Sequence, residues 1–575
     1  MAKSTPIWYS IPEWYGIQQQ VDGTNLPVTT AYDARNMETC DGNLSVAKGY
    51  TKYISKAIPG TAKILKLIVA KGTNDVFVVR EDSIYHWDST TNDWVDLLHF
   101  DESVPSGQVD TLQTKIGMDN VVLVATGTVN EDGQDTRSMV KLSLSTGLAS
   151  WFGAGLYSYE GTVSSFDAET GTMTLSDAMD AEAQRRALAY GVMYGPGDDL
   201  VYVDVASIPD STHIVLDVAL VTTPEANDNV KIRGGGSNAP VQYIEMYANR
   251  LFAAGDTTAK TRLYWSAIPG DGRTMEDWLS VDGSQDASGG FVDVGDSEQD
   301  PIIGITALSN QLLIWKRYSV WRLYGDRPST FTLERLDDHS DIMSNAGVVV
   351  KYDAPYLLMW NGIHTYNNVS VVPVDGGVKP LRRFFDLDAN GQNTVDISNS
   401  RGAFYDNRFY MTCKTKTTPA STYDNAIIVF DVARNSYMIR DGFQVADIVA
   451  VGSSLYVVDG NRYVCEFERG SSYNGSPISA YWYTQPTDFG RKMNRHQAME
   501  LYAHITGDAV KATVIGDYLN NVKSVVPLSV RAGYTTVRFN TDQQYFIQFK
   551  FENVSGGVFT LHGGINIHVL SELKE

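Results

Sequence analysis

Oxygen-bearing side chains at alternate positions form the first candidate site in the sequence. In DLDANGQNTVD, residues 386–396, Asp386, Asp388 and Asn390 stand two apart and a glycine follows. This is the order of the first half of a calcium-binding loop, in which alternate oxygen ligands meet on one cation and glycine allows a sharp turn. The twelfth position is Ile397 rather than the glutamate that supplies a bidentate ligand. The segment is therefore either a calcium site formed by these three residues or an ordinary turn rich in Asp and Asn.

A second acidic segment, RLDDHSD, places Asp337, His339 and Asp341 two apart. In an extended strand the three side chains share one face, which suits a metal or a catalytic role. A solvated loop is the alternative interpretation. The sequence has no GxSxG nucleophile turn, no HExxH zinc motif, no GxxxxGK[ST] phosphate loop and no complete GxGxxG. Because these motifs carry the commonest hydrolytic and nucleotide chemistry, we expect no enzyme and no cofactor other than the calcium considered above.

The three cysteines, Cys40, Cys413 and Cys465, are odd in number and far apart, and no two form a CxxC pair. This pattern favours free thiols in a reducing compartment over a disulfide framework or a zinc site. The first residues lack a cationic stretch followed by an apolar core, and no apolar run approaches the ~20 residues of a membrane helix. The sequence therefore predicts a protein assembled in the cytoplasm, without a membrane-spanning segment.

The charge balance is strongly acidic. The 575 residues include 68 Asp and Glu against 46 Lys and Arg, a formal net charge of −22. Such a chain is poorly suited to hold DNA or RNA by neutralising phosphates, and it would let a passing nucleic acid slide without sticking. Two basic groups stand out, KPLRRFF at 379–385 and GRKMNRH at 490–496. They suit either an acidic surface of a neighbouring subunit or local ion pairs.

One sequence pattern, which we call the phrase, recurs along the chain and indicates the secondary-structure elements that would position the candidate site residues. It consists of a polar turn, a short apolar run, a polar hinge such as Lys316-Arg317, and an aromatic-rich run. Branched and aromatic residues suit a pleated sheet, and Asn, Asp and Gly suit turns, so each copy predicts a β-hairpin. Asn361-Gly362 and Asp459-Gly460 have the chemistry of two-residue turns. The copies lie at residues 73–88, 249–267, 310–325, 354–367 and 453–467.

The spacing of these hairpins predicts an all-β chain built around a β-propeller. The combined length of the two regions that carry the phrase, divided by the ~45 residues of a typical four-stranded blade, corresponds to about seven blades. Stacked β-sandwiches are the alternative architecture. We expect an extended N-terminal arm with a hairpin near Asp41-Gly42, which lies across a neighbouring domain or subunit because its Trp and Tyr side chains need burial. The expected domains are the arm at 1–56, first blades at 57–141, an inserted β-rich domain at 142–236, remaining blades at 237–475 and a C-terminal β-sandwich at 476–575.

The inserted domain contains a predicted hairpin around residues 169–171. It also contains the strongest helix prediction of the chain, DAMDAEAQRRALAYG at 177–191, in which Ala, Glu and Arg favour a helix and Gly191 ends it.

The order of phrases from residue 249 to 367 resembles the β-propeller proteins of bacteriophage tails, including the nozzle or tail tubular proteins of short-tailed phages. NRLFAAG is followed by LYWSAIPGDGRTMEDW, then by VDVGDSEQDPIIGITALSNQLLIWKRYSVWRLYG, and finally by AGVVVKYDAPYLLMWNGIHTYN. The N-terminal DARNMETCDGNLSVAKGYTKY is similar to the opening of such proteins. Together these phrases cover about a third of the chain, and all are turn and strand signatures.

The resemblance implies a structural virion protein of the phage tail. Members of that family form rings, commonly sixfold, below the portal or adaptor, and surround the channel through which the genome leaves. The implied partners are copies of the chain itself and portal-adaptor or other tail proteins, with DNA passing through the lumen without specific binding. A carbohydrate-active or receptor-binding propeller that acts on the bacterial envelope is the competing hypothesis.

Overall fold

The computed structural model describes most of the chain. The described residues are 5–19, 25–105, 109–132, 135–153, 157–197, 199–217, 222–234, 239–269, 274–276, 286, 288–338, 344–359, 362–375, 380–386, 394–416, 422–517, 522–528 and 534–573. They divide into two compact units, Gly60–Ser340 and the combination of Met1–Pro59 with Asp341–Glu575. The chain is all-β, a β-propeller with a small inserted β-rich domain and a C-terminal β-sandwich, and its described part contains one α-helix. Among the described residues, no helix has the length and apolar character needed to cross a membrane.

The unit Gly60–Ser340 contains four antiparallel four-stranded sheets, each with its strands in chain order, which we name blades 1 to 4. Apolar clusters join blade 1 to blade 2, blade 2 to blade 3 and blade 3 to blade 4. Blade 1 consists of β6 (Ile64–Val69), β7 (Val76–Arg80), β8 (Ser83–Asp88) and β9 (Asp93–His99), and blade 2 of β10 (Asp110–Ile116), β11 (Asp119–Asp132), β12 (Asp135–Ser143) and β13 (Ala149–Trp151). Blade 3 consists of β21 (Tyr243–Tyr247), β22 (Arg250–Ala254), β23 (Arg262–Trp265) and β24 (Gly290–Asp293). Blade 4 consists of β25 (Ile302–Leu308), β26 (Gln311–Lys316), β27 (Ser319–Tyr324) and β28 (Thr332–Asp338), with the 3₁₀ turn Pro328–Thr330 before β28.

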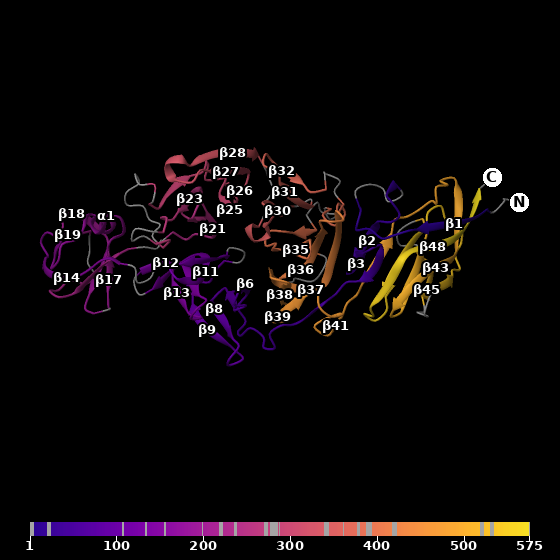
Figure 1. Ribbon diagram of the computed structural model, residues 1–575, viewed down its shortest axis with the longest axis horizontal. Coiled ribbons are helices and arrows are strands. Elements are labelled where there is room, and N and C mark those ends of the chain that lie inside the picture. The colour runs from indigo at the N-terminus through magenta and orange to yellow at the C-terminus, as the bar shows by residue number, and fades with distance from the viewer. Residues whose placement is uncertain are drawn as a thin grey trace. The chain divides into compact units, whose positions relative to one another are not determined.

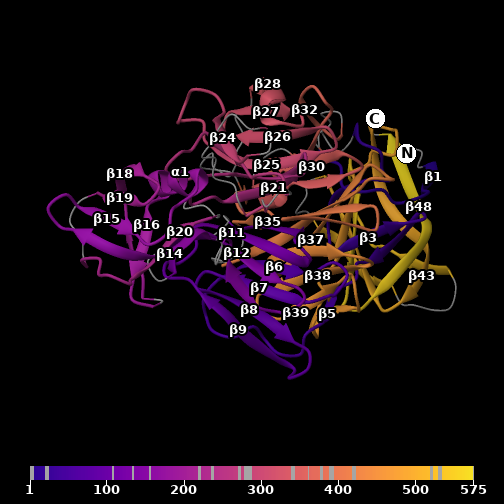
Figure 2. The same cartoon turned by 60° about the vertical axis from the view of Figure 1, so that its left-hand side comes forward.

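The inserted domain lies in sequence between blades 2 and 3. It is a seven-stranded sheet in the order β17-β16-β20-β14-β15-β19-β18, with helix α1 (Ala181–Tyr190) against it (Figure 2). The predicted helix and the hairpin at 169–171 are confirmed: Asp180 caps α1 by accepting from the Ala183 N–H at 2.7 Å, and Gly191 ends it. The strands are β14 (Tyr157–Asp167), β15 (Thr172–Leu175), β16 (Val192–Gly195), β17 (Val201–Val203), β18 (Val205–Asp210), β19 (His213–Leu216) and β20 (Asn229–Arg233).

The second unit contributes three more blades, 5 to 7, so the described residues form seven. The outermost strand of blade 7 is β5, which comes from the N-terminal part of the chain and pairs with β39 through Tyr50 opposite Phe467. Blade 5 follows the 3₁₀ turn Asn345–Gly347 and consists of β29 (Val349–Lys351), β30 (Ala354–Met359), β31 (Gly362–Tyr366) and β32 (Val371–Pro373). Blade 6 consists of β34 (Gly402–Tyr405), β35 (Arg408–Thr415), β36 (Asp424–Asp431) and the first half of β37 (Ser436–Val451), with β33 (Val395–Asp396) beside β35. Blade 7 consists of the second half of β37, β38 (Ser454–Asp459), β39 (Val464–Phe467) and β5 (Tyr50–Lys52), and its sheet continues with β40 (Ser472–Tyr473) and β41 (Ser476–Pro477).

The five predicted hairpins are confirmed, and each forms the two middle strands of a blade. These strands are covered on both faces and not on one alone: all five residues of β7 and all six of β26 are buried. Two consecutive residues with positive φ close the inner turn in several blades, as at Ala248-Asn249 and Asp406-Asn407. That conformation matches the right-handed twist of the strands, and Asn and Asp tolerate it.

One predicted turn is wrong. Asp459-Gly460 does not form a two-residue turn, because β38 ends at Asp459 and β39 begins only at Val464. The carboxylate of Asp459 accepts the N–H groups of Asn461 at 3.0 Å and Tyr463 at 2.8 Å, which widens the loop. Asn361, the first residue of the other predicted turn, lies outside the described residues.

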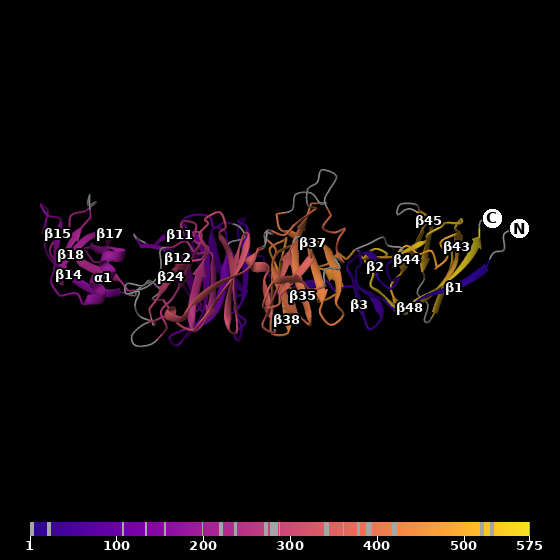
Figure 3. The same ribbon diagram turned by 90° about the horizontal axis from the view of Figure 1, so that it is seen from above.

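The C-terminal sandwich contains strands from both ends of the chain. In Figures 1 and 3 the indigo strands β1 to β3 lie among the yellow strands of this sandwich. One sheet joins β1 (Thr5–Ile11), β3 (Met37–Cys40), β4 (Asn43–Val46), β43 (Asn494–Gly507), β46 (Tyr534–Arg538) and β48 (Phe559–Leu573), and the other joins β2 (Ala31–Arg35), β42 (Tyr481–Thr484), β44 (Val510–Ile515), β45 (Val522–Leu528) and β47 (Gln548–Asn553).

The N-terminal segment is therefore built into its own chain rather than laid across another subunit. Its hairpin at Asp41-Gly42 is confirmed as β3 and β4. Trp14 is 1% exposed, donates from its indole N–H to the carbonyl of Gly563 at 2.7 Å, and meets Trp482 edge-on. Not all of the expected burial occurs, because Trp8 is 60% exposed. One apolar cluster extends from Ile11 through blades 5 to 7 to Val569, so both ends of the chain share a core with the last blades.

Candidate functional site

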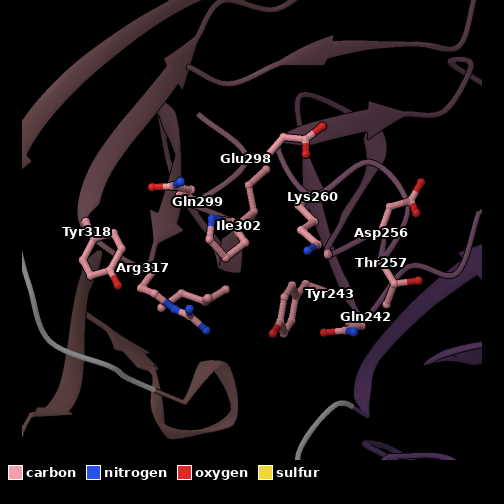
Figure 4. Close-up of a pocket in the computed structure, with 13 residues that line it drawn as sticks. Gln242, Tyr243, Asp256, Thr257, Lys260, Glu298, Gln299, Ile302, Arg317 and Tyr318 are labelled. Carbon is pink, nitrogen blue, oxygen red and sulfur yellow. The ribbon is translucent and has the colours of Figure 1, made fainter. Parts of the chain in front are cut away.

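A pocket of about 700 Å³ opens between blades 3 and 4 (Figure 4). It lies where β21 and β25 begin, where β22 ends, and at the turn between β26 and β27, so loops of both blades form its walls. We call it the blade 3–4 pocket. Its lining is Gln242, Tyr243, Gly255, Asp256, Thr257, Lys260, Glu298, Gln299, Pro301, Ile302, Ile303, Arg317 and Tyr318.

Hydrogen bonds fix the wall of the pocket that comes from blade 3. The carboxylate of Asp256 accepts the N–H and the hydroxyl of Thr258, both at 2.7 Å, and the hydroxyl of Tyr264 at 2.6 Å. Burial opposes ionisation of Asp256, but these donors lower its pKa below the usual value. Gly255 has φ +78°, and a Cβ there would lie 2.7 Å from the ring of Tyr243. Glycine therefore allows both the turn and the close approach of that ring.

The wall from blade 4 is held by Asp300. Its carboxylate accepts the N–H of Tyr318 at 2.7 Å and the hydroxyl of Ser319 at 2.5 Å, and it lies 3.7 Å from Nζ of Lys316. Lys316 is buried and donates to the Val294 carbonyl at 2.5 Å. Burial lowers the pKa of this ammonium group, with Asp300 opposing the effect. These contacts set the turn that carries Arg317.

Two cations face the pocket. Lys260 and Arg317 are exposed, and among the described residues neither side chain has a hydrogen-bond or ion-pair partner. In Figure 4, Nζ of Lys260 and the guanidinium of Arg317 both point toward the centre of the pocket from opposite walls. Other arginines on these blades are paired, as Arg262 is with Asp293 and Arg322 with Glu334. The arrangement suits a ligand with a negative charge.

A pair of carboxylates lies beside the pocket on the innermost strands of blades 2 and 3. Asp110 accepts the N–H of Ile244 at 3.2 Å, and Glu245 accepts the N–H of Met246 at 3.0 Å. Burial is the main cause that raises the pKa of Glu245 to about 7, and the charge of Asp110 adds to it.

This raised pKa predicts a pH dependence of stability. The folded chain keeps a proton on Glu245 that the unfolded chain releases near pH 4.5, so the free energy of unfolding falls as pH rises from about 4.5 to about 7. Glu245→Gln removes this dependence and retains an acceptor, so we expect it to stabilise the protein by about 2 kcal/mol at pH 8 and to have little effect at pH 4.5. Urea denaturation at the two pH values measures this, with the exposed Glu102→Gln as the control. Equal effects of Glu245→Gln at both pH values would contradict the assignment.

The residues singled out in the sequence are not brought together in this pocket. Asp388 and Asn390 lie outside the described residues, as do His339 and Asp341, and nothing is described of the Asp337 side chain. Asp386 is described, and its backbone carbonyl accepts the hydroxyl of Thr394 at 2.8 Å. Within the described part of the chain, no group of three or more His, Cys, Asp or Glu residues is placed to hold a metal ion.

The cysteines and the two basic groups do not line the pocket. All three cysteines are free thiols, as predicted, with Cys413 and Cys465 buried. In the first basic group, the guanidinium of Arg383 lies 3.8 Å from the centre of the Tyr32 ring, and in the second Arg495 lies 5.2 Å from that of Tyr545. These two arginines thus contact aromatic rings of their own chain.

Sequence reasoning missed the pocket because its two cations are 57 positions apart and belong to different blades. The only local signal was the Lys316-Arg317 hinge, in which one cation is buried against Asp300 and the next is exposed.

The sequence matches no protein-family model and no curated protein. The solved structures that this chain matches include the computationally designed Ika8 protein, with a TM-score of 0.32 and 12% identity over 72% of this chain and 98% of that one. The AfRom2 CNH domain has a TM-score of 0.33 and 9% identity over 73% and 99% of the two chains. The Neurospora crassa Pan2 WD40 domain has a TM-score of 0.30 and 7% identity over 74% and 96%. At these TM-scores the similarities carry no argument about function.

Proposed function

We propose that this chain is a structural protein of a bacteriophage tail, which forms a ring around the DNA exit channel and takes part in retention and ejection of the genome. The proposal begins from the order of turn and strand phrases between residues 249 and 367 and from the N-terminal phrase. The proposed partners are other copies of the chain, in a ring that is commonly sixfold, and portal-adaptor or other tail proteins. The proposed location is the virion tail, after assembly in the host cytoplasm.

The structural observation that carries the proposal is the way in which the chain fastens its own ends. β5 completes blade 7, while β1 to β4 enter the sandwich that the last 95 or so residues form. The guanidinium of Arg462 donates to the carbonyls of Ile58 at 3.0 Å and Pro59 at 2.8 Å, just where the chain leaves this unit. Pulling on either end must therefore break a sheet pairing, which suits a part that bears load while DNA moves.

Charge supports a conduit through which DNA slides. The formal charge of −22 makes the average surface repel phosphates, so a ring of such chains would keep DNA from adhering to its wall. The strength of this repulsion falls with salt, because the screening length is about 10 Å at 0.1 M.

The proposal is tested by the mass of the full-length protein in solution, measured by light scattering across protein concentration and salt. We expect a discrete multiple of the chain mass, alone or after a portal-adaptor complex is added, which does not grow further with concentration, because a ring closes. The proposal would be contradicted if the protein stayed monomeric in the presence of every tail component and cleaved envelope polysaccharide. That result would favour the carbohydrate-active alternative.

A further inference from the structure

The blade 3–4 pocket is a candidate binding site that the tail proposal does not explain. It is concave, it belongs to one compact unit, and its volume of about 700 Å³ lies in the range of pockets that hold small organic ligands. We propose that it binds an acidic saccharide, whose carboxylate or phosphate group lies between Lys260 and Arg317. This inference is independent of the tail proposal.

Within the part of the chain that the structure describes, the two cations serve no internal contact. Lys260 and Arg317 are both exposed and without a side-chain partner in the described part of the chain. In a chain with 22 more acidic than basic residues, a cation would find an acidic neighbour easily. Two that converge on one cavity from different blades suit an anionic group between them, with the planar guanidinium providing paired donors.

Backbone hydrogen bonds hold the two turns from which Lys260 and Arg317 extend. The N–H of Ile302 donates to the carbonyl of Lys260 at 2.9 Å, which ties the Lys260 turn of blade 3 to the first strand of blade 4. The N–H of Arg317 donates to the carbonyl of Pro301 at 3.1 Å, and Asp300 fixes the turn beyond it. Because these turns are set before a ligand arrives, binding has to order the two side chains but not the turns, which reduces the loss of conformational entropy.

The rest of the ligand must fill the remaining volume of the pocket, because a lone phosphate ion would leave most of it empty. The rings of Tyr243 and Tyr318 and the apolar Pro301 and Ile302 offer surfaces to the flat, weakly apolar face of a sugar ring. Gln242, which Figure 4 shows at the base of the pocket, supplies an amide donor and acceptor for hydroxyl groups. Aromatic surface together with neutral hydrogen-bonding groups and a cation pair favours a saccharide over a simple anion.

An extended nucleic acid fits the surroundings poorly. The chain as a whole is strongly acidic, and the pocket itself carries Asp256 and Glu298 beside its two cations. A phosphate backbone would meet repulsion along its length, whereas a short acidic saccharide places one charge where the cations are.

The test is calorimetric titration of the full-length protein with defined probes at low salt. The probes are a tetrasaccharide of hexuronic acid, a phosphorylated tetrasaccharide of neutral sugars, the neutral tetrasaccharide maltotetraose, inorganic phosphate and tetraglutamate. We expect saturable binding of one or both acidic tetrasaccharides, with affinity about tenfold or more above that for every other probe, because a charged hydrogen bond and ring contacts are then made together. The two acidic probes distinguish a carboxylate from a phosphate as the recognised group.

Variants connect binding to the pocket. Lys260→Ala and Arg317→Ala should each weaken binding about tenfold, and the double variant should abolish it, while Arg317→Lys retains part of the affinity. Lys115→Ala, an exposed cation in blade 2, is the matched control and should bind as the unchanged protein does. All of these side chains are exposed, so melting temperatures should remain near that of the unchanged protein, which verifies folding.

Three results would overturn the inference. The first is that neither acidic tetrasaccharide binds saturably, and the second is that binding survives the double substitution of Lys260 and Arg317 by Ala. The third is that tetraglutamate binds as tightly as the acidic tetrasaccharides, which would assign the pocket to an acidic peptide instead. Ring formation in solution is measured separately, so a failure here leaves the tail proposal to its own test.

Discussion

Trp14→Ala is expected to destabilise the sandwich unit by about 3–5 kcal/mol, because it removes a fully buried indole and leaves a cavity. The side chain is 1% exposed, contacts Trp482 and Phe551 edge-on, and donates a hydrogen bond to the carbonyl of Gly563 at 2.7 Å. The measurement is urea denaturation of the full-length protein, followed by far-ultraviolet circular dichroism. The midpoint of the transition assigned to this unit should move to lower urea.

Trp8→Ala is the matched control. Trp8 belongs to the same N-terminal segment but is 60% exposed, and its main contact is a ring stacked on His568 at 4.7 Å. We expect a cost of about 1 kcal/mol, typical of an exposed aromatic pair. If both substitutions had the same small effect, the N-terminal segment would not be a bound part of the sandwich in solution.

Arg440→Met should cost about 3–5 kcal/mol in the same measurement, because it removes one member of a buried charge network. Arg440 is 1% exposed, lies 3.7 Å from Glu468 and 3.9 Å from Glu38, and donates to the Met37 carbonyl. The network joins the N-terminal hairpin to blades 6 and 7. Burial raises the pKa of Glu468, with Arg440 opposing the effect, so without the guanidinium this buried carboxyl loses its main opposite charge and keeps the hydrogen bond from the Tyr410 hydroxyl at 3.2 Å.

Two comparisons separate this effect from general sensitivity to substitution. Arg469→Met breaks the 3.1 Å pair between the exposed Arg469 and the partly buried Glu466, and should cost at most about 1 kcal/mol. Combining Arg440→Met with Glu468→Gln should recover part of the loss, because the orphaned charge is then removed. If the losses in free energy of unfolding caused by Arg440→Met and by Glu468→Gln simply added up in the double variant, the two side chains would not interact. That result would contradict the structure.

The sequence predicted the parts of the fold that are local. Each confirmed hairpin lies within about twenty residues, and its strand-forming residues and turn residues are adjacent in the chain. Helix α1 was predicted for the same reason, since its cap at Asp180 and its end at Gly191 are both local signals. The prediction of a two-residue turn at Asp459-Gly460 was wrong because the Asp459 carboxylate accepts the N–H groups of Asn461 and Tyr463, contacts that composition does not specify.

Long-range pairings could not be predicted from one sequence. Trp14 and its acceptor Gly563 are 549 residues apart, and β5 pairs with β39 across most of the chain. The aromatic residues of the N-terminal segment indicated that it must be buried, but not that its partner is the sandwich of the same chain. The blade 3–4 pocket is similar: Lys260 and Arg317 become neighbours only when two blades associate.

Negative-stain electron microscopy of the full-length protein, alone and with a portal-adaptor complex, tests the central claim most directly. The account predicts closed rings of uniform diameter with a central opening, whose class averages have a defined rotational symmetry. Single particles of one chain under every condition, including with the portal-adaptor complex, would contradict it.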